Sequence, residues 1–285
     1  MKIFVLALVL LTMTTGEAKV KVHGHRGARA ILPENTLVGF EYALKIGVDV
    51  LEMDLAVTKD NHLVVSHDPY INSDICLDSE GKKPKENTMI RSLSLKQVKS
   101  YDCGSVKNKR FPKQKTIKGE KIPTLDEVFK MVKASKHNKD VEFNIETKIF
   151  PAHPEITPTP EEFSKLVVEL VQKHKLQKRT IIQSFDYRTL IEVKKLDASI
   201  RTSQLTYANL LDSVAVVNAS KADILSPHYE WITASEVKRL HQNKLQVAPW
   251  TANDPKVWQK LVEMNVDAII TDDPEALIKF LKSQD

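Results

Sequence analysis

Three acidic residues, Glu52, Asp54 and Glu146, occur where they could bind a metal ion together. Glu52 and Asp54 are two positions apart in a strand-like run, and this spacing puts both carboxylates on one face of a strand. Glu146 ends another strand-like run and adds a third carboxylate. Because neighbouring buried anions repel each other unless a cation lies between them, we expect a cation here. Oxygen ligands of this kind favour Ca²⁺ or Mg²⁺ over zinc.

Two histidines and two cationic side chains are predicted to join this acidic group. His25-Arg26 follows the first strand-like run and is flanked by glycines, in a chain that has only eight. Such glycines suggest a backbone that must approach a neighbour closely. His67 follows a short strand-like run, and Lys148 comes two residues after the third carboxylate. A cation and basic side chains offset charge on phosphoryl oxygens while imidazoles transfer protons, so the set indicates phosphodiester cleavage.

The segments that must position these residues alternate between strand and helix patterns. Strands are predicted over 20–25, 48–55, 141–146, 180–184, 200–205, 223–226, 245–249 and 268–271, with a short extra one over 63–66. Helices are predicted over 36–46, 125–134, 163–174, 187–196, 210–217, 234–241, 255–264 and 275–281. This alternation predicts a parallel sheet. Eight units without a long linker favour one (β/α)₈ TIM barrel, with a doubly wound open sheet as the alternative.

Residues 1–18 have the pattern of a signal peptide. A positive start, Met1-Lys2, precedes an apolar run over 3–13, and Gly16-Glu17-Ala18 supplies the small residues expected at a cleavage site. The apolar run is shorter than the ~20 residues that a transmembrane helix needs. We therefore expect a mature protein that begins near Lys19, consists of one barrel domain over 19–285, and is secreted or periplasmic.

The basic residues gather in a predicted insertion at about 72–118, after the second strand region. The whole chain is 42% hydrophobic and 28% charged, which is typical of a globular protein. Its net charge is +5, and the insertion alone has twelve Lys or Arg against five Asp or Glu. The insertion lacks aromatic residues interleaved with its basic ones, so no nucleic-acid partner is expected. We interpret it as a surface near a site for anionic substrates, where it would raise encounter rates.

The two cysteines of the chain, Cys76 and Cys103, both lie in this insertion. In an exported protein such a pair is readily oxidised. A bond between them would stabilise the fold by roughly 3–4 kcal/mol in the chain-entropy model, provided that their Cα atoms lie within about 7 Å. We predict a disulfide that clamps the insertion.

The motifs of the chain resemble those of glycerophosphodiester phosphodiesterases, in particular secreted bacterial ones. In chain order they are His25-Arg26-Gly27, Pro33-Glu34-Asn35-Thr36, Glu52-Met53-Asp54, Thr58-Lys59-Asp60, His67-Asp68, Glu146-Thr147-Lys148, Gln183-Ser184-Phe185, Trp250-Thr251-Ala252-Asn253-Asp254 and Ile270-Thr271-Asp272-Asp273-Pro274. They span nearly the whole mature chain, and the N-terminal cluster is highly specific. The chain departs from the family at Tyr70-Ile71-Asn72-Ser73, where Arg-Thr-Thr is common, so the resemblance defines the reaction more sharply than the substrate.

The resemblance implies a TIM barrel and metal-dependent hydrolysis of glycerophosphodiesters to glycerol 3-phosphate and an alcohol. It implies that His25 and His67 are the acid–base pair. It also implies that one Ca²⁺ or Mg²⁺ is held by Glu52, Asp54 and Glu146. The attacking group is either water or a neighbouring hydroxyl of the substrate, the latter through a cyclic phosphate.

Three further residues match family positions that contact the substrate. Arg26 and Lys148 would contact the phosphate, and Trp250 would line the substrate mouth. A core position is the alternative for Trp250, because Trp is often largely buried. The expected partner is therefore a small anionic phosphodiester, and no obligate protein partner is evident.

Other functions remain open at this point. A lysophospholipase D-like phosphodiesterase is the nearest, but no amphipathic membrane-binding helix stands out, so we expect small soluble diesters and no stable membrane insertion. A zinc amidohydrolase is suggested by His23-Gly24-His25, which puts two imidazoles on one strand face. It leaves the three carboxylates unexplained. A binding protein without catalysis is the third alternative.

Overall fold

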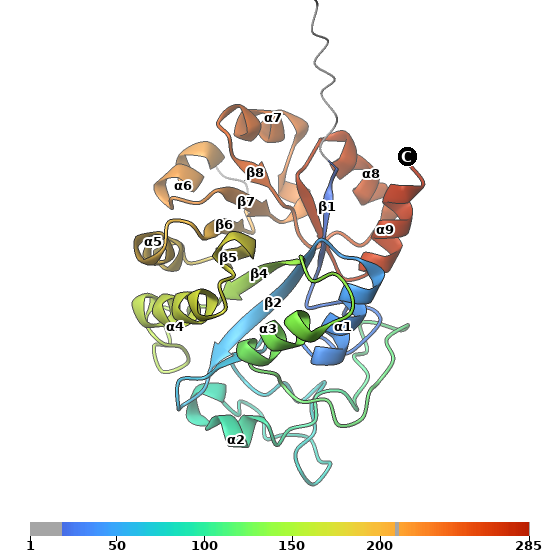
Figure 1. The fold of residues 1–285 in the computed structure, drawn as a ribbon, viewed down its shortest axis with the longest axis vertical. Helices are drawn as coiled ribbons and strands as arrows, with labels where there is room; N and C mark the ends of the chain where they lie inside the picture. The colour runs from blue at the N-terminus through green and yellow to red at the C-terminus, as the bar shows by residue number, and fades with distance from the viewer. Residues whose placement is uncertain (1–18, 209–210, 285) are drawn as a thin grey trace, which may run out of the picture.

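Eight parallel strands, each followed by a helix, form the framework of the molecule (Figure 1). The computed structural model describes residues 19–208 and 211–284, so the predicted signal peptide lies outside the described residues. The parallel strands are β1 (Lys21–Gly24), β2 (Val50–Val57), β4 (Glu142–Thr147), β5 (Thr180–Ser184), β6 (Arg201–Thr206), β7 (Ile224–Pro227), β8 (Gln246–Val247) and β9 (Ala268–Thr271). The helices are α1 (Leu37–Ile46), α3 (Leu125–Ala134), α4 (Pro160–Lys173), α5 (Tyr187–Leu196), α6 (Ser213–Ala219), α7 (Ala234–Gln242), α8 (Pro255–Glu263) and α9 (Pro274–Lys282).

The strands follow one another in the order β8-β7-β6-β5-β4-β2-β1-β9. The ring closes through backbone hydrogen bonds between β9 and the chain at β8. The amide of Asp267 donates to the carbonyl of Val247 (3.0 Å), and that of Ile270 donates to the carbonyl of Pro249 (3.0 Å). A third bond runs from the amide of Ala252 to the carbonyl of Ile270 (3.0 Å). The predicted TIM barrel is therefore confirmed, and the open-sheet alternative is wrong.

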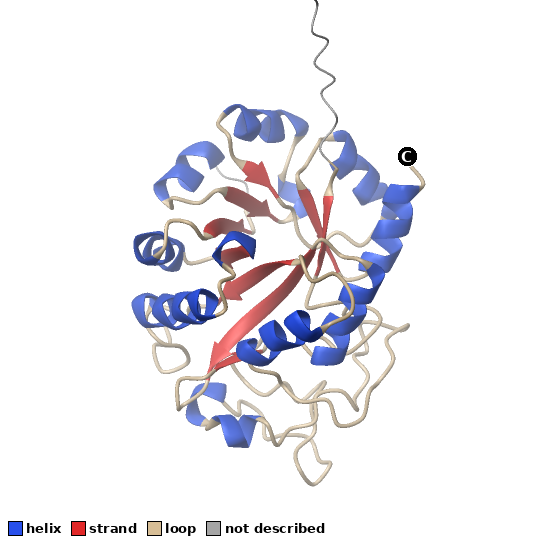
Figure 2. Ribbon diagram, in the orientation of Figure 1, coloured by secondary structure: helices blue, strands red, loops and turns tan. Residues whose placement is uncertain are grey.

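The helices lie outside the ring of strands (Figure 2), and apolar side chains fill the layer between them. Phe40 of α1, Phe129 of α3 and Phe163 of α4 are almost completely buried there. Burying a side chain of this size contributes about 1.5–3 kcal/mol. Within the described residues, no helix is long and apolar enough to cross a bilayer.

The predicted elements are present, although most of their ends differ from the prediction by one to three residues. Helix α4 begins at Pro160 rather than at 163, because Thr159 caps it by accepting a hydrogen bond from the amide of Glu162. Helix α6 begins at Ser213, capped by Asp212, whereas the pattern predicted 210–217. Strand β8 has two residues instead of the predicted 245–249, although its hydrogen bonds continue beyond Val247.

The insertion lies between β3 (Leu63–Val65), which pairs antiparallel with β2, and α3. It is mostly loop, with a short helix, α2 (Leu95–Val98), that the sequence did not predict. Cys76 and Cys103 form the predicted disulfide. They belong to a small apolar cluster that attaches the insertion to β2 and β3 and consists of Ala56, Val64, Ile71, Cys76, Ile90, Val98, Cys103 and Ile122.

The insertion also contacts the loop between β1 and α1. The buried Gln114 donates from its Nε2 to the backbone carbonyl of Arg29 (2.7 Å). The amide of Lys115 donates to the carbonyl of Ile31 (2.8 Å). The insertion therefore supports the loop that follows the first strand, where His25 and Arg26 lie.

Candidate active site

Strands β2 and β4 bring the three predicted acidic residues together at the mouth of the barrel. Asp54 lies opposite Glu146 in the β2–β4 register, and Glu52 precedes Asp54 on the same face. One carboxylate oxygen of each lies within 4.8 Å of the others, and the residues are only 1%, 0% and 7% exposed in the order Glu52, Asp54, Glu146. Among the described residues, this is the one group of three or more acidic, His or Cys side chains close enough to share a metal ion.

The proximity of these buried carboxylates shifts their pKa values. Burial, and then the charge of Asp54, raise the pKa of Glu52 well above its usual value. Burial also raises the pKa of Glu146, although Lys148 opposes it. Burial acts in the same direction on Asp54, but Lys148 and Arg26 outweigh it and hold its pKa well below the usual value. A divalent cation among the three would stabilise all of them in the ionised form.

The hydrogen bonds around the cluster leave room for such a cation. Glu52 accepts from Gln183 Nε2 (2.8 Å) at Oε1 and from the amide of Arg26 (2.9 Å) at Oε2. Asp54 accepts from Asn35 Nδ2 (3.0 Å) at Oδ2, but its buried Oδ1 has no hydrogen bond. Lys148 Nζ lies 3.1 Å from that oxygen as an ion pair, outside hydrogen-bond geometry. An all-oxygen set in which one buried oxygen accepts no hydrogen bond fits Ca²⁺ or Mg²⁺.

The turn after β1 is shaped by its two glycines, as the sequence suggested. A Cβ atom at Gly24 would lie 2.2 Å from the carbonyl oxygen of Gly27, and Gly27 itself has a φ of +88°. Between them Arg26 has a φ of 50°, in the left-handed region that non-glycine residues rarely adopt. This turn aims the amide of Arg26 at Glu52, while its guanidinium pairs with Glu34 (2.7 Å).

His25 is held at the end of β1 by a buried carboxylate. Its Nδ1 lies 2.6 Å from Oδ1 of Asp272, which directly follows β9, and its Nε2 lies 3.8 Å from Oε2 of Glu52. Burial and the nearby Arg29 lower the pKa of His25 to about 4, although Asp272 opposes this. The imidazole is therefore neutral near pH 7, and its bond to Asp272 places the proton on Nδ1. Nε2 then faces the acidic cluster with a free lone pair.

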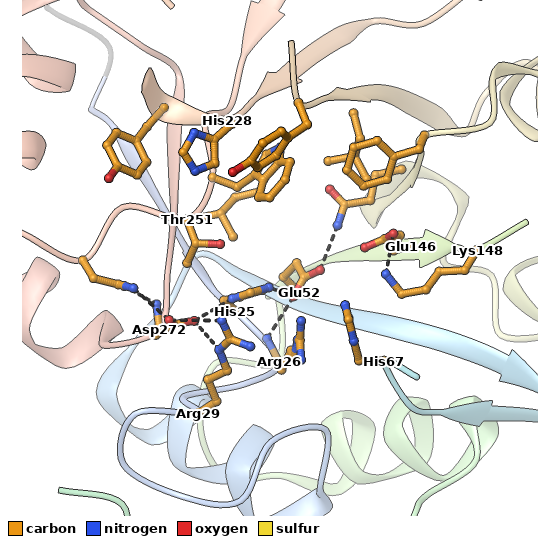
Figure 3. Close-up of a pocket in the computed structure, with 18 of the residues that line it drawn as sticks. His25, Arg26, Arg29, Glu52, His67, Glu146, Lys148, His228, Thr251 and Asp272 are labelled. Carbon is orange, nitrogen blue, oxygen red and sulfur yellow. Dashed lines mark hydrogen bonds and ion pairs between the residues drawn. The ribbon is translucent and has the colours of Figure 1, made fainter. Parts of the chain in front are cut away.

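His67 reaches the same site from the start of the insertion and is more exposed. Its side chain is 37% exposed, against 11% for His25. Its Nδ1 lies 2.8 Å from Oδ1 of Asp68, the next residue, whose side chain is itself 38% exposed. Figure 3 shows His25, with Asp272, at one end of the pocket and His67, with Lys148, at the other.

One cavity of 460 Å³ contains both histidines together with Arg26, Glu52, Glu146 and Lys148. Trp250 lies in its wall and is only half-buried, so the alternative of a core position is wrong. The indole Nε1 donates to the carbonyl of Ser226 (2.8 Å). Its ring packs against Phe185, Tyr207 and His228, with centroid separations of 5.6, 5.8 and 5.4 Å. Aromatic side chains therefore form the wall opposite the charged groups.

Sequence reasoning placed Asp272 and Asn253 in family motifs but did not predict the network that they form with Arg29 behind His25. Asp272 accepts from both Nε and Nη2 of Arg29, the latter at 3.2 Å, and from Asn253 Nδ2 (2.8 Å). Asp272 follows the last strand, so the rule that barrel sites lie at the carboxyl ends of strands marks it. Arg29 carries no such signal, because it is one arginine in a loop of irregular structure.

The arrangement of the described residues does not suit the zinc alternative. His23 is buried and lies 3.4 Å from Asn144 Nδ2 through its Nδ1. Burial lowers its pKa to about 3. It lines a different cavity, one that also contains Lys21 and Gln246 from the starts of their strands. His23 and His25 therefore face opposite ends of the barrel and do not form one metal site.

Comparisons with known proteins give a consistent result. The family model of the glycerophosphoryl diester phosphodiesterase family matches residues 25–276. A glycerophosphodiester phosphodiesterase of Caldanaerobacter subterraneus is 31% identical, and the match covers 93% of this chain and 98% of that one. Another from Bacillus subtilis is 30% identical, over 90% and 85% of the two chains.

Solved structures share the fold over nearly the whole chain. A candidate glycerophosphoryl diester phosphodiesterase of Silicibacter pomeroyi has a TM-score of 0.88 at 26% identity, covering 94% of each chain. A phosphodiesterase of Oleispira antarctica, solved with the product sn-glycerol-3-phosphate, has a TM-score of 0.77 at 24% identity, covering 92% and 96%. With the site geometry and the family match together, this chain belongs to the glycerophosphoryl diester phosphodiesterase family.

Proposed function

We infer that this protein is a metal-dependent phosphodiesterase that hydrolyses glycerophosphodiesters to glycerol 3-phosphate and an alcohol. The observation that carries the inference is the buried carboxylate cluster with His25 at one end of the cavity and His67 at the other. The family to which the chain belongs supports the same reaction. The Oleispira structure, with its bound product, supports a phosphate monoester of glycerol as the product.

The residues of the cluster are suited to hold one Ca²⁺ or Mg²⁺. Glu52, Asp54 and Glu146 would be its ligands, because they offer oxygen atoms only. When bound, the cation offsets negative charge on the phosphoryl oxygens. Arg26 Nε and Lys148 Nζ lie 3.2 Å and 3.1 Å from the oxygens of Asp54, so both would reach a phosphate bound at the cluster. Like the cation, the positive charges of Arg26 and Lys148 would stabilise the negative charge that the phosphate carries in the transition state.

The two histidines then carry protons on opposite sides of the phosphate. Neutral His25 accepts a proton at Nε2 from the nucleophile, which is water or the neighbouring glycerol hydroxyl. Asp272 stabilises the imidazolium that forms, because it already accepts the Nδ1 proton. Protonated His67 gives its proton to the leaving alcohol. Trp250 would contact the substrate from the opposite wall of the cavity.

The experiment that tests this function measures glycerol 3-phosphate released from glycerophosphocholine by residues 19–285. We expect EDTA to abolish release and one of Ca²⁺ or Mg²⁺ to restore it. Trapping a cyclic phosphate would assign the attack to the glycerol hydroxyl. A protein that releases no glycerol 3-phosphate from any glycerophosphodiester, with either cation, would contradict the proposal. Release that EDTA leaves unchanged would contradict the part of the proposal that requires a cation.

We also propose that the protein is exported after cleavage of residues 1–18. Two observations support this proposal: the signal-peptide pattern of the sequence, and the disulfide between Cys76 and Cys103, a bond typical of oxidising compartments. N-terminal sequencing of the secreted or periplasmic fraction should find Lys19 at or near the first position. Finding Met1 on that material would contradict the proposal.

A further inference from the structure

A second cavity, of 300 Å³, adjoins the active site on the side of His67. We call it the side cavity. It shares His67, Glu146, Lys148 and Phe185 with the main cavity, so a ligand can extend from one to the other. The rest of its wall comes from the residues next to His67, from the end of β4 and the loop after it, and from the end of β5, and is formed by Asp68, Pro69, Thr147, Ile149, Phe150 and Ser184.

The side cavity lies where the leaving-alcohol half of the substrate would be bound. In an in-line displacement the attacking and leaving oxygens lie on opposite sides of the phosphorus. His25, the acceptor of the nucleophile's proton, and His67 lie at opposite ends of the main cavity (Figure 3). An alcohol that takes its proton from His67 therefore leaves toward the side cavity. This step rests on the proposed function, because that function assigns His67 to the leaving group.

We propose that the side cavity binds the leaving alcohol and selects one that ends in a quaternary ammonium group, such as choline, over a polyol. Pro69, Ile149, Phe150 and Phe185 give the cavity apolar walls. Hydroxyl groups held against these four side chains lose hydrogen bonds to water that the four cannot replace, whereas Asp68, Thr147 and Ser184 line other parts of the cavity. The methyl groups of a trimethylammonium have no hydrogen bonds to lose.

The charge of the cavity wall agrees with a cationic alcohol. Asp68 supplies a carboxylate, which accepts hydrogen bonds from His67 and from Asn72 Nδ2 (2.7 Å) and is still 38% exposed. The rings of Phe150 and Phe185 add faces that attract a quaternary ammonium. Lys148 and the protonated His67 are the cationic side chains in the wall. The charge of Lys148 is offset by Glu146 Oε1 at 2.6 Å and by Asp54, and that of His67 by Asp68 Oδ1 at 2.8 Å.

Two diesters that share the glycerol 3-phosphate half test the selection directly. We compare kcat/KM for glycerol 3-phosphate release from glycerophosphocholine and from glycerophosphoglycerol, under identical cation and salt. We expect glycerophosphocholine to be preferred by about tenfold or more, because each unsatisfied buried hydroxyl costs roughly that factor. Equal values, or a preference for the polyol, would overturn the side cavity as a selective site while leaving the proposed function intact. No release from either diester would overturn both.

A substitution in the cavity wall assigns the preference to this site. Phe150→Asn places an amide where the wall is aromatic, without changing any residue proposed for catalysis. We expect it to reduce the preference about tenfold while kcat/KM for glycerophosphoglycerol stays within about twofold. Leu196→Ala, an exposed apolar position at the end of α5, is the matched control and should leave the preference unchanged. An equal loss for both diesters, or an unchanged preference, would contradict the assignment.

Inhibition by the free alcohols gives a second measurement that does not depend on that variant. Choline should inhibit hydrolysis of both diesters at a concentration about tenfold lower than glycerol does, and Ile149→Asn should remove most of that difference. Melting temperatures within a few degrees of the parent protein would show that Phe150→Asn and Ile149→Asn are folded. Choline that inhibits no better than glycerol would contradict the proposal.

Discussion

The two ends of the active site are built in different ways. At one end His25 follows a central barrel strand, and its partner Asp272 follows the adjacent strand, with a side chain that is 5% exposed. At the other end His67 follows the short antiparallel strand β3, and its partner Asp68 is the next residue, with a side chain that is 38% exposed. The first pair is fixed by the barrel, and the second by a loop.

This difference agrees with the work proposed for each histidine. A base that activates one nucleophile benefits from a fixed position and a fixed tautomer, and a buried carboxylate provides both. An acid that protonates the leaving group must admit the alcohol and let it depart after the reaction. An exposed histidine beside an open cavity allows that. The comparison therefore predicts that substitutions around His25 lower activity by displacing the base. Substitutions around His67 should lower it by an amount that depends on how much the leaving alcohol needs a proton.

The largest effects are expected from the histidines themselves. His25→Ala and His67→Ala should each lower turnover of glycerophosphocholine by about 10²–10⁴-fold, as loss of general acid–base catalysis does. A diester with a p-nitrophenol leaving group distinguishes the two, because this alcohol departs without protonation. It should restore much of the activity of His67→Ala and little of that of His25→Ala. Equal restoration in both variants would break the comparison, and near-normal turnover by either would contradict its role.

The carboxylates that position the histidines come next. Asp272→Asn should lower kcat by about 10–100-fold, since it removes the charge that orients His25 and leaves the buried Arg29 with weaker pairing. Asp68→Asn should cost only a few-fold, because both side chains of that pair are more than one-third exposed and solvent weakens their interaction. The measurement is kcat for both variants at matched cation concentration. A larger loss in Asp68→Asn than in Asp272→Asn would reverse the comparison.

The disulfide should affect turnover less than either histidine. Replacing both Cys76 and Cys103 with Ser removes a clamp worth roughly 3–4 kcal/mol in the chain-entropy model. The loss should act on the insertion first, so kcat should fall only a few-fold while the insertion becomes sensitive to proteolysis. Limited proteolysis that cuts near 76–103 before any barrel helix would agree with this. A protein cut first within the barrel would contradict it.

The smallest effect is expected at the contact between the insertion, which begins beside His67, and the loop after β1, which carries His25. Gln114→Ala removes the hydrogen bonds that its Nε2 donates to the carbonyls of Arg29 and Leu32, and the one that its Oε1 accepts from the amide of Asn108, at about 1–3 kcal/mol in all. Thermal unfolding should show a melting temperature lower by about 2–6 °C. Activity at 25 °C should change by less than about threefold. A loss of activity as large as that of Asp272→Asn would show that the insertion also positions His25.

The sequence predicted the barrel and the gathering of the three carboxylates for identifiable reasons. Strand and helix patterns locate the carboxyl end of each strand, and Glu52 and Asp54 share a face because of the strand period. The pairing of Asp54 with Glu146 follows once the parallel order is known. The ends of the helices were predicted less accurately than their existence. A cap such as Thr159 or Asp212 acts over a single turn, so the hydrophobic period does not locate it.

The remaining features depend on contacts between distant parts of the chain. Arg29 bonds to Asp272, 243 positions away, and no local pattern indicates that pairing. The side cavity likewise arises where the residues after β3 meet the loop after β4. The insertion has little regular structure, so periodicity carries little information about how it folds.

In the turn after the first strand, Arg26 has two tasks, and each is performed by a different part of the residue. The group that supports Glu52 is the amide of Arg26, which every amino acid except proline possesses, while the phosphate contact would be made by its side chain. A change of the side chain at this position would leave that hydrogen bond to Glu52 in place, but it would remove the ion pairs with Glu34 and Asp54. The flanking Gly24 has no such freedom, because a Cβ there would collide with the backbone of Gly27.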